Sequence, residues 1–288
     1  MTAVPAGTTT GTTTGTTAPA GARSGDAVDA ALAQGRSALV GYLPVGFPDL
    51  DGSVAAARAL VTGGCDIVEL GLPYSDPLMD GPVIQEAVDA ALKAGTRTRD
   101  VLAAVEQVAA TGAAVLVMTY WNPIDRYGVD RFAADLASAG GCGLITPDLI
   151  PDEAGDWLAA SDAQDLERVF LVAPSSTDER LRSTAAASRG WIYAASTMGV
   201  TGVRSQVGER AQGLVERTRA AGAPRVCVGL GVSTGDQAAT VAAYGDGVIV
   251  GSAFVRALAD KGPAGVERLA GELAEGVRRG RGARGESS

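Results

Sequence analysis

The sequence predicts a single-domain (β/α)8 barrel, an α/β fold, with one extra helix before the first strand. Three observations predict it: a length of 288 residues, a hydrophobic content of 46%, and eight short apolar runs that alternate with alanine-rich helical patterns. Every connection between consecutive runs is long enough for a helix, and strands joined in this way are parallel. The alternative is an open doubly wound sheet. Such a sheet more often carries a GxGxxG motif after its first strand, and none follows Leu43.

The eight apolar runs are the expected strands, at residues 39–43, 66–71, 114–118, 143–146, 169–172, 191–194, 226–229 and 247–250. A helical pattern at residues 26–34 precedes the first of them. The helices expected between the strands include residues 54–61, 101–110, 131–139, 179–187, 211–220 and 237–243.

The two ends of the chain differ in composition from the barrel, which is expected at residues 26–277. Residues 1–25 are nearly all Thr, Gly, Ala and Pro, too poor in large apolar groups to offset the entropy of ordering. We expect them to form a disordered extension. The arginine- and glycine-rich end, residues 278–288, is expected to fray into a flexible tail.

Charge and cysteine content narrow the classes of partner. The formal net charge of -9 disfavours binding to nucleic acid or to anionic lipid. The three cysteines, Cys65, Cys142 and Cys227, lie far apart in or near apolar runs and are interpreted as buried, reduced thiols. No run approaches the length of a membrane span and no secretory signal is evident, so a cytoplasmic protein is expected.

The amino-acid content also excludes several mechanisms. Without histidine, the Ser-His-Asp and Cys-His mechanisms and the usual zinc sites cannot form, and no metal is expected. The only lysines, Lys93 and Lys261, lie far from any expected strand end, which disfavours a Schiff base. Acid and base chemistry therefore falls to carboxylates or tyrosine.

Glu69 is the first candidate for that chemistry. In the run 66–71, period-2 alternation places Ile67 and Glu69 on one side and Val68 and Leu70 on the other. If the apolar pair meets the helices, Glu69 points into the barrel, where burial would raise its pKa into the range of a general acid. The alternative is a glutamate paired with an arginine.

The loop after this strand ends just before a helix that opens with Pro82. Asp76 is interpreted as a turn residue. Asp80 has two readings from the residues alone, a functional carboxylate or a contact to the free N–H groups of the helix.

Glycines follow the last three strands, at Gly199-Val200-Thr201-Gly202, Gly229-Leu230-Gly231 and Gly251-Ser252. Glycine allows close approach of backbone N–H groups to an anion, and a helix start adds a favourable dipole. Each glycine pair alone is explained equally well by a turn. Three pairs at consecutive late strand ends favour a phosphate site.

Together these residues resemble a known family. The string Glu69-Leu70-Gly71-Leu72-Pro73-Tyr74-Ser75-Asp76-Pro77 with Asp80-Gly81-Pro82, followed by Phe170-Leu171-Val172-Ala173-Pro174 and Gly199-Val200-Thr201-Gly202, closely resembles the tryptophan synthase α chain, over residues 26 to 277. The resemblance implies a TIM barrel and a lyase of tryptophan biosynthesis that cleaves indole-3-glycerol phosphate into indole and glyceraldehyde 3-phosphate.

The resemblance also implies roles for individual residues. Glu69 corresponds to the catalytic glutamate, and Asp80 to the aspartate that engages the indole NH. The implied substrate-binding residues are Tyr42 beside the indole, Tyr193 at the floor of the site, Thr201 in the loop after the sixth strand, and Gly202, Gly231, Gly251 and Ser252 around the phosphate.

The implied partner is a β subunit that carries pyridoxal phosphate, in an α2β2 assembly, so that no cofactor is expected in this chain. Tyr120-Trp121-Asn122 resembles a contact loop for that subunit. The family also implies loops after the second and sixth strands that the partner orders.

Other readings remain beside this one. Indole-glycerol phosphate synthase needs a catalytic lysine at a strand end, which this chain lacks; phosphoribosylanthranilate isomerase is a related rival. A non-catalytic activator of a β subunit is disfavoured by the presence of Glu69 and Asp80. A stand-alone indole lyase of specialised metabolism is not separated by the sequence.

Overall fold

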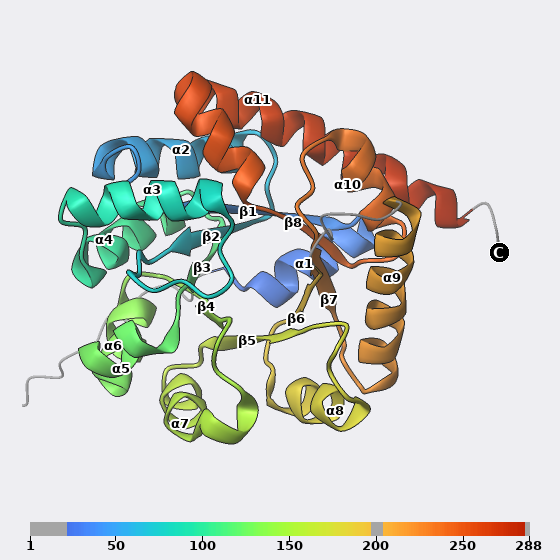
Figure 1. Cartoon of the computed structure of the whole chain (residues 1–288), viewed down its shortest axis with the longest axis horizontal. Coiled ribbons are helices and arrows are strands. Elements are labelled where there is room, and N and C mark those ends of the chain that lie inside the picture. The colour runs from blue at the N-terminus through green and yellow to red at the C-terminus, as the bar shows by residue number, and fades with distance from the viewer. Residues whose placement is uncertain (1–21, 197–203, 286–288) are drawn as a thin grey trace, which may run out of the picture.

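The computed structural model describes residues 22–196 and 204–285 and shows eight parallel strands closed into a barrel (Figure 1). Each strand pairs with the next in chain order, and the last pairs with the first. The strands are β1 (Ala38–Pro44), β2 (Ile67–Gly71), β3 (Ala114–Met118), β4 (Gly143–Thr146), β5 (Glu167–Val172), β6 (Ile192–Ala195), β7 (Val226–Gly229) and β8 (Gly247–Val250). The predicted fold class is confirmed, and no predicted strand end is displaced by more than 2 residues.

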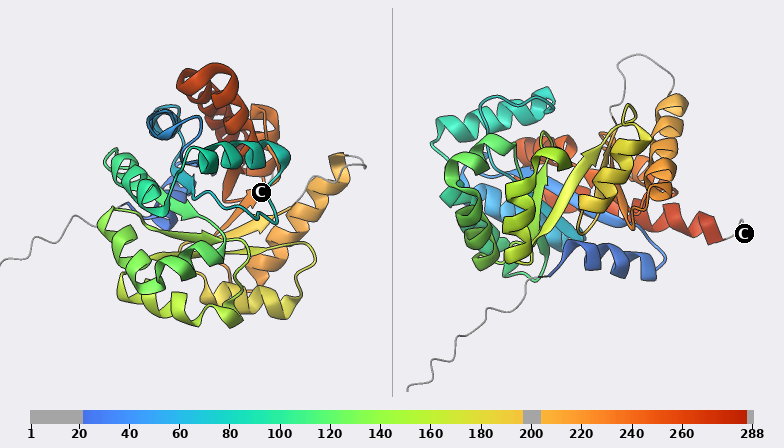
Figure 2. Two further views of the ribbon diagram at one scale, coloured as in Figure 1. Left: turned by 60° about the vertical axis from the view of Figure 1, so that its left-hand side comes forward. Right: turned by 90° about the horizontal axis from the view of Figure 1, so that it is seen from below.

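Helices surround the barrel (Figures 1 and 2). They are α1 (Ser24–Ala33), α2 (Leu50–Thr62), α3 (Pro82–Lys93), α4 (Thr98–Ala109), α5 (Trp121–Tyr127), α6 (Val129–Ser138), the 3-10 helix η1 (Pro151–Glu153), α7 (Gly155–Ala163), α8 (Asp178–Ala187), α9 (Arg204–Ala220), α10 (Gly235–Ala242) and α11 (Ser252–Gly285). Asp49, Thr177 and Thr234 cap α2, α8 and α10, because their side chains accept backbone N–H groups in the first turns of these helices.

Alternation along the strands builds two apolar cores. Val68 and Leu70 of β2 belong to the outer core between strands and helices, whereas Ile67 belongs to the core inside the barrel. The three cysteines are free and buried, as predicted. Because the period along a strand is 2, Glu69 lies on the same side as Ile67, inside the barrel.

Helix α1 covers the amino-terminal end of the barrel. Val28 and Ala31 pack into the inner core, and the right-hand view of Figure 2 shows α1 at the end opposite α3. The helix begins on Glu167 of β5, whose buried carboxylate accepts the backbone N–H groups of Ser24 at 2.9 Å and Gly25 at 3.0 Å. A carboxylate placed there satisfies N–H groups that have no partner inside the helix. The extra helix therefore closes the amino-terminal end of the barrel and completes its inner core.

The carboxyl-terminal helix corrects one expectation. Helix α11 continues through Arg278 to Gly285, with a kink at Gly262 and Pro263, so the boundary expected at residue 277 falls inside a helix. Tertiary contacts hold the segment. Arg279 donates to Asp236 at 2.9 Å, and a Cβ at Gly280 would overlap the backbone of Ala239, which shows how closely α11 crosses α10.

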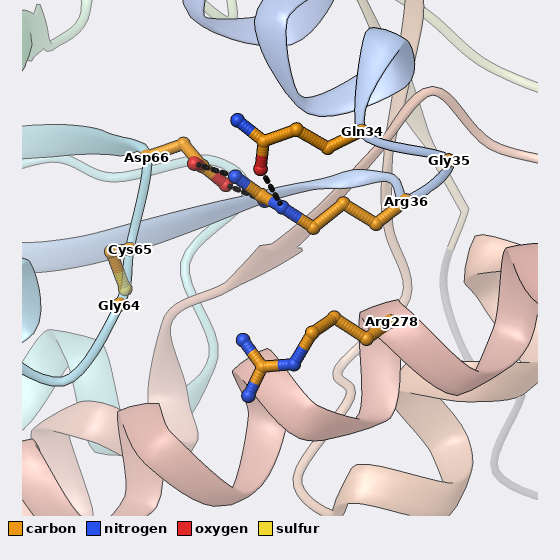
Figure 3. A pocket seen from close by; sticks show the side chains of 7 residues that line it. All are labelled: Gln34, Gly35, Arg36, Gly64, Cys65, Asp66 and Arg278. Atoms are coloured by element: carbon orange, nitrogen blue, oxygen red, sulfur yellow. Dashed lines mark hydrogen bonds and ion pairs between the residues drawn. The ribbon is translucent and has the colours of Figure 1, made fainter.

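Arg278 also lines a cavity of about 460 Å³ at the amino-terminal face (Figure 3). Across this cavity, Arg36 donates two hydrogen bonds to Asp66, at 2.7 and 2.8 Å. Asp66 in turn accepts the N–H of Leu39 at 2.8 Å, which joins the beginnings of β1 and β2. This end of the barrel is therefore closed by structural contacts. In the described part of the chain, no helix has both the length and the apolar character needed to cross a membrane.

Candidate active site

A cavity of about 870 Å³ lies at the carboxyl ends of the strands, the end where barrel enzymes place their chemistry. All eight strands, or the segments that follow them, contribute to its wall. The described lining consists of Tyr42, Glu69, Met79, Asp80, Gly81, Ile84, Met118, Tyr120, Pro147, Leu171, Ala173, Pro174, Ser175, Tyr193, Ala195, Ser196, Arg210, Gly229, Leu230, Gly231, Ile249, Gly251 and Ser252. Apolar walls with a few polar groups suit a ligand that has an apolar body and polar ends.

Glu69 is the most unusual group in this cavity. Its side chain is 0% exposed, and neither carboxyl oxygen has a hydrogen-bond partner among the described residues. Burial raises the pKa of Glu69 to about 8. The carboxyl therefore holds its proton at neutral pH, as a general acid requires. The predicted inward orientation is found, and the alternative pairing with an arginine is not present among the described residues.

Two tyrosines lie in the wall beside Glu69. Burial, together with the nearby carboxyl groups of Asp80 and Glu69, raises the pKa of Tyr42 and Tyr193 well above the usual phenol value. Both phenols therefore stay protonated. Each ring lies against a glycine of the neighbouring strand, Tyr42 against Gly71 and Tyr193 against Gly229, where a Cβ would overlap the ring. The two glycines make the space that the rings occupy.

Asp80 lies in the loop between β2 and α3 and is half-buried. Burial raises the pKa of its carboxyl above the ordinary value. Helix α3 begins with Gly81 as its cap residue and without a side-chain cap, so the carboxylate of Asp80 does not cap the helix. The loop is held instead by its backbone, because Gln85 donates to the carbonyl of Asp80 at 2.7 Å and the N–H of Met79 donates to the Tyr120 hydroxyl at 3.0 Å. Of the two readings of Asp80, the structure favours the functional carboxylate.

The part of the cavity wall at the ends of β7 and β8 offers backbone N–H groups. Gly231 has a φ of 72°, a conformation that favours glycine, and Ser252 is the first residue of α11. The first helical N–H groups that bind the carbonyl of Gly251 are those of Phe254 at 2.8 Å and Val255 at 3.1 Å. The N–H groups of Ser252 and Ala253 come before the first hydrogen bonds of the helix, so they have no acceptor within it. The helix dipole favours an anion at this position.

Two of the expected substrate-binding residues, Thr201 and Gly202, lie outside the described residues, as does the rest of the first glycine motif at 199–202. The other expected site residues, Glu69, Asp80, Tyr42, Tyr193, Gly231, Gly251 and Ser252, all line the one cavity.

Sequence reasoning missed much of the cavity wall. Met118, Leu171 and Ile249 belong to strands, and period-2 alternation along each strand would have pointed to them once the inward face was known. Arg210 was also missed. It belongs to helix α9, and no strand pattern could have placed it at the cavity.

The rim of the cavity exposes apolar side chains. Leu78 is 81% exposed and Met79 is 54% exposed, both in the loop between β2 and α3. The expected contact segment, residues 120–122, lies next to this loop: the Tyr120 ring is 5.3 Å from that of Tyr74, and α5 begins at Trp121. Exposed large apolar groups beside a ligand cavity are typical of a surface that another protein covers.

This arrangement can transfer protons at one side of a ligand and hold an anion at the other. The protonated carboxyl of Glu69 and the carboxyl of Asp80 lie with β2. The N–H groups of Gly231 and Ser252 follow β7 and β8. Among the described residues, no group of three His, Cys, Asp or Glu side chains is arranged to hold a metal ion.

Comparison with known proteins gives one consistent family. The family model described as tryptophan synthase alpha chain matches residues 28–278. A tryptophan synthase alpha chain from Thermobifida fusca is 62% identical over 257 residues, which cover 86% of this chain and 95% of that protein. Another, from Acidothermus cellulolyticus, is 59% identical over 258 residues, which cover 88% of this chain and 97% of that protein.

Solved structures give the same result. A crystal structure of tryptophan synthase from M. tuberculosis in its aminoacrylate-bound form is 57% identical with a TM-score of 0.83, and the match covers 88% of this chain and 99% of that one. A tryptophan synthase alpha chain from Legionella pneumophila superposes with a TM-score of 0.79 at 29% identity, over 92% of this chain and 99% of that one.

Proposed function

The chain belongs to the tryptophan synthase alpha chain family, and we propose that its barrel cavity cleaves indole-3-glycerol phosphate into indole and glyceraldehyde 3-phosphate. The enzyme is a carbon-carbon lyase of tryptophan biosynthesis. The observation that carries the mechanism is Glu69, a fully buried carboxyl without a hydrogen-bond partner among the described residues, in one cavity with Asp80, Tyr42 and Tyr193.

The first step is protonation of the indole ring at C3. Glu69 supplies this proton, because its pKa of about 8 keeps it protonated at neutral pH. Protonation makes the ring a cationic electron sink, so the cleavage needs no Schiff-base lysine. Asp80, on the neighbouring loop, binds the ring N–H and stabilises the positive charge that develops at the nitrogen.

The second step breaks the carbon-carbon bond. The carboxylate of Glu69 accepts the proton of the glycerol hydroxyl next to the ring, and the C–H-bearing carbinol carbon becomes the aldehyde carbon of glyceraldehyde 3-phosphate. The electron pair of the broken bond returns to the ring, which leaves as indole. Glu69 ends the reaction protonated, as it began.

The substrate lies across the cavity in this assignment. Its bicyclic ring occupies the floor of the cavity between Tyr42 on β1 and Tyr193 on β6, and its phosphate lies at the ends of β7 and β8, beside Gly231, Gly251 and Ser252. We assign Thr201 and Gly202 to the same phosphate site from the family resemblance. Binding of the phosphate fixes the ring at Glu69, so the remote contact contributes to the rate.

The partner is the β subunit, in an α2β2 assembly. The exposed side chains of Leu78 and Met79, with the segment at residues 120–122, support its docking beside the cavity. The β subunit carries the pyridoxal phosphate and receives the indole. The described lining of the α cavity contains no lysine with which that cofactor could form a Schiff base.

We further assign residues 1–25 to an extension outside the enzyme domain, since the family match begins at residue 28. The compartment is the cytoplasm, which keeps free thiols such as the three buried cysteines reduced.

The test is release of indole from indole-3-glycerol phosphate by the purified chain, measured with and without the β subunit of the same organism. We expect measurable release by the chain alone and a several-fold or greater increase with the β subunit, because a partner that orders active-site loops assembles the catalytic groups. No release in either case refutes the reaction. Release that the β subunit leaves unchanged refutes the coupling and favours a stand-alone lyase.

A further inference from the structure

Arg210 is the only cationic residue among the described residues that line the cavity. It is exposed on α9, and no hydrogen bond or ion pair joins it to another described residue. The two carboxylic acids of the described lining, Glu69 and Asp80, belong to β2 and the loop after it. The guanidinium is therefore available to a ligand inside the cavity.

The position of Arg210 in the fold puts it at the anion-binding side. Helix α9 connects β6 to β7, and the ends of these strands contribute Ser196 and Gly231 to the same cavity. One turn further along α9, Leu214 is buried in the outer core, so this stretch of the helix is turned toward the barrel. In the closed strand order, β6 and β7 lie across the barrel from β2, which separates Arg210 from Glu69 and Asp80.

We propose that Arg210 contacts the phosphate group of the substrate and so helps to determine specificity for a phosphorylated ligand. This inference rests on the proposed function and adds a side-chain cation to a phosphate site otherwise built from backbone N–H groups and Ser252. A phosphate monoester carries between one and two negative charges at neutral pH, and guanidinium matches its oxygens in geometry. The carboxyl of Asp80 lies with β2, and repulsion between like charges favours placing the phosphate away from it, beside Arg210.

Three variants and three ligands distinguish a phosphate contact by Arg210 from an arginine that only contacts solvent. Arg210→Gln removes the charge, and Arg210→Lys keeps it. Arg256→Gln removes an exposed charge from the first turns of α11, outside the cavity lining, and is the matched control. The probes are indole-3-glycerol phosphate for kinetics, glycerol 3-phosphate as a phosphate ligand without the ring, and indole as a ring without the phosphate.

For Arg210→Gln we expect KM for the substrate and Kd for glycerol 3-phosphate to rise by about three- to tenfold, the range for a charged contact at an exposed position. The values of kcat and of Kd for indole stay at the wild-type level. Arg210→Lys recovers most of the affinity, and Arg256→Gln changes none of these constants. Raising the ionic strength weakens glycerol 3-phosphate binding more in the wild type than in Arg210→Gln. Salt screens the attraction between Arg210 and the phosphate, which the variant lacks.

An unchanged Kd for glycerol 3-phosphate in Arg210→Gln overturns the proposal. Equal weakening of indole binding also overturns it, because that result indicates a general disturbance of the cavity. Equal weakening in Arg256→Gln overturns it as well, because the effect would then be one of overall charge. If the wild type releases no indole while glycerol 3-phosphate binding still depends on Arg210, the proposed reaction fails and the phosphate contact stands.

Discussion

Tyr42 on β1 and Glu69 on β2 are register partners, side by side across two hydrogen-bonded strands. Both side chains therefore belong to the same inward face of the barrel, and both line the cavity. Burial raises the pKa of Glu69 to about 8, and the buried Tyr42 occupies the neighbouring position on β1. The raised pKa of Glu69 is thus a consequence of its buried place inside the barrel.

Replacement of Glu69 tests the proton transfers directly. In Glu69→Gln the amide cannot transfer a proton to C3, so we expect indole release to fall by about 10² to 10⁴, the contribution typical of a proton-transfer group. Substrate affinity, measured by equilibrium binding, is expected to stay close to the wild-type value. Glu106→Gln, an exposed change on α4, is the control and should retain full activity. A Glu69→Gln enzyme that releases indole at the wild-type rate contradicts the mechanism.

The pH profile follows from the protonated state of Glu69. The free enzyme needs the proton, and the pKa is about 8, so kcat/KM should stay level near neutral pH and fall as pH rises through that value. The profile is measured by indole release under subsaturating substrate. A profile that instead rises between pH 7 and 9 would show that the ionised form starts the reaction.

The free energy of unfolding should also depend on pH through Glu69. The pKa of Glu69 is raised on folding from 4.5 to about 8, so the folded state binds the extra proton and loses stability as pH rises through this interval. Between pH 5 and 7.5 the wild type should lose about 3 kcal/mol relative to Glu69→Gln, whose amide does not titrate. Urea unfolding of both proteins at the two pH values gives the difference. Equal pH dependence would mean that Glu69 is not buried in the folded chain in solution.

Gly71 and Tyr42 give a prediction about packing. A Cβ at Gly71 would overlap the ring of Tyr42, which is buried. We expect Gly71→Ala to cost about 1–3 kcal/mol of unfolding free energy and to lower activity, since overpacking displaces the ring. Adding Tyr42→Ala to Gly71→Ala should cost less than the sum of the single changes. Gly155→Ala, with open space at its Cβ, is the control for stability, and strict additivity would contradict the contact.

Local patterns predicted most of the barrel and the inward face of β2. Strand ends came within 2 residues because each strand is a short apolar run bounded by polar residues, a feature of neighbouring positions. The carboxyl-terminal helix was predicted wrongly for the converse reason. Glycine and arginine favour fraying by composition, whereas the close crossing of α11 on α10 and the ion pair of Arg279 with Asp236 depend on segments far apart in the chain.

Two buried strand glutamates show where sequence reasoning stops. By itself, the sequence determined that Glu69 lies in an apolar run, that no histidine or well-placed lysine competes for the chemistry, and that glycines follow the late strands. Only the tertiary structure decided the roles of the two glutamates. Glu167 lies at the start of β5, where the first turn of α1 supplies hydrogen bonds to its carboxylate. Glu69 lies toward the open end of β2 without a partner among the described residues. Burial with donors stabilises a charge, and burial without them holds a proton, so the surroundings separate a structural carboxylate from an acid catalyst.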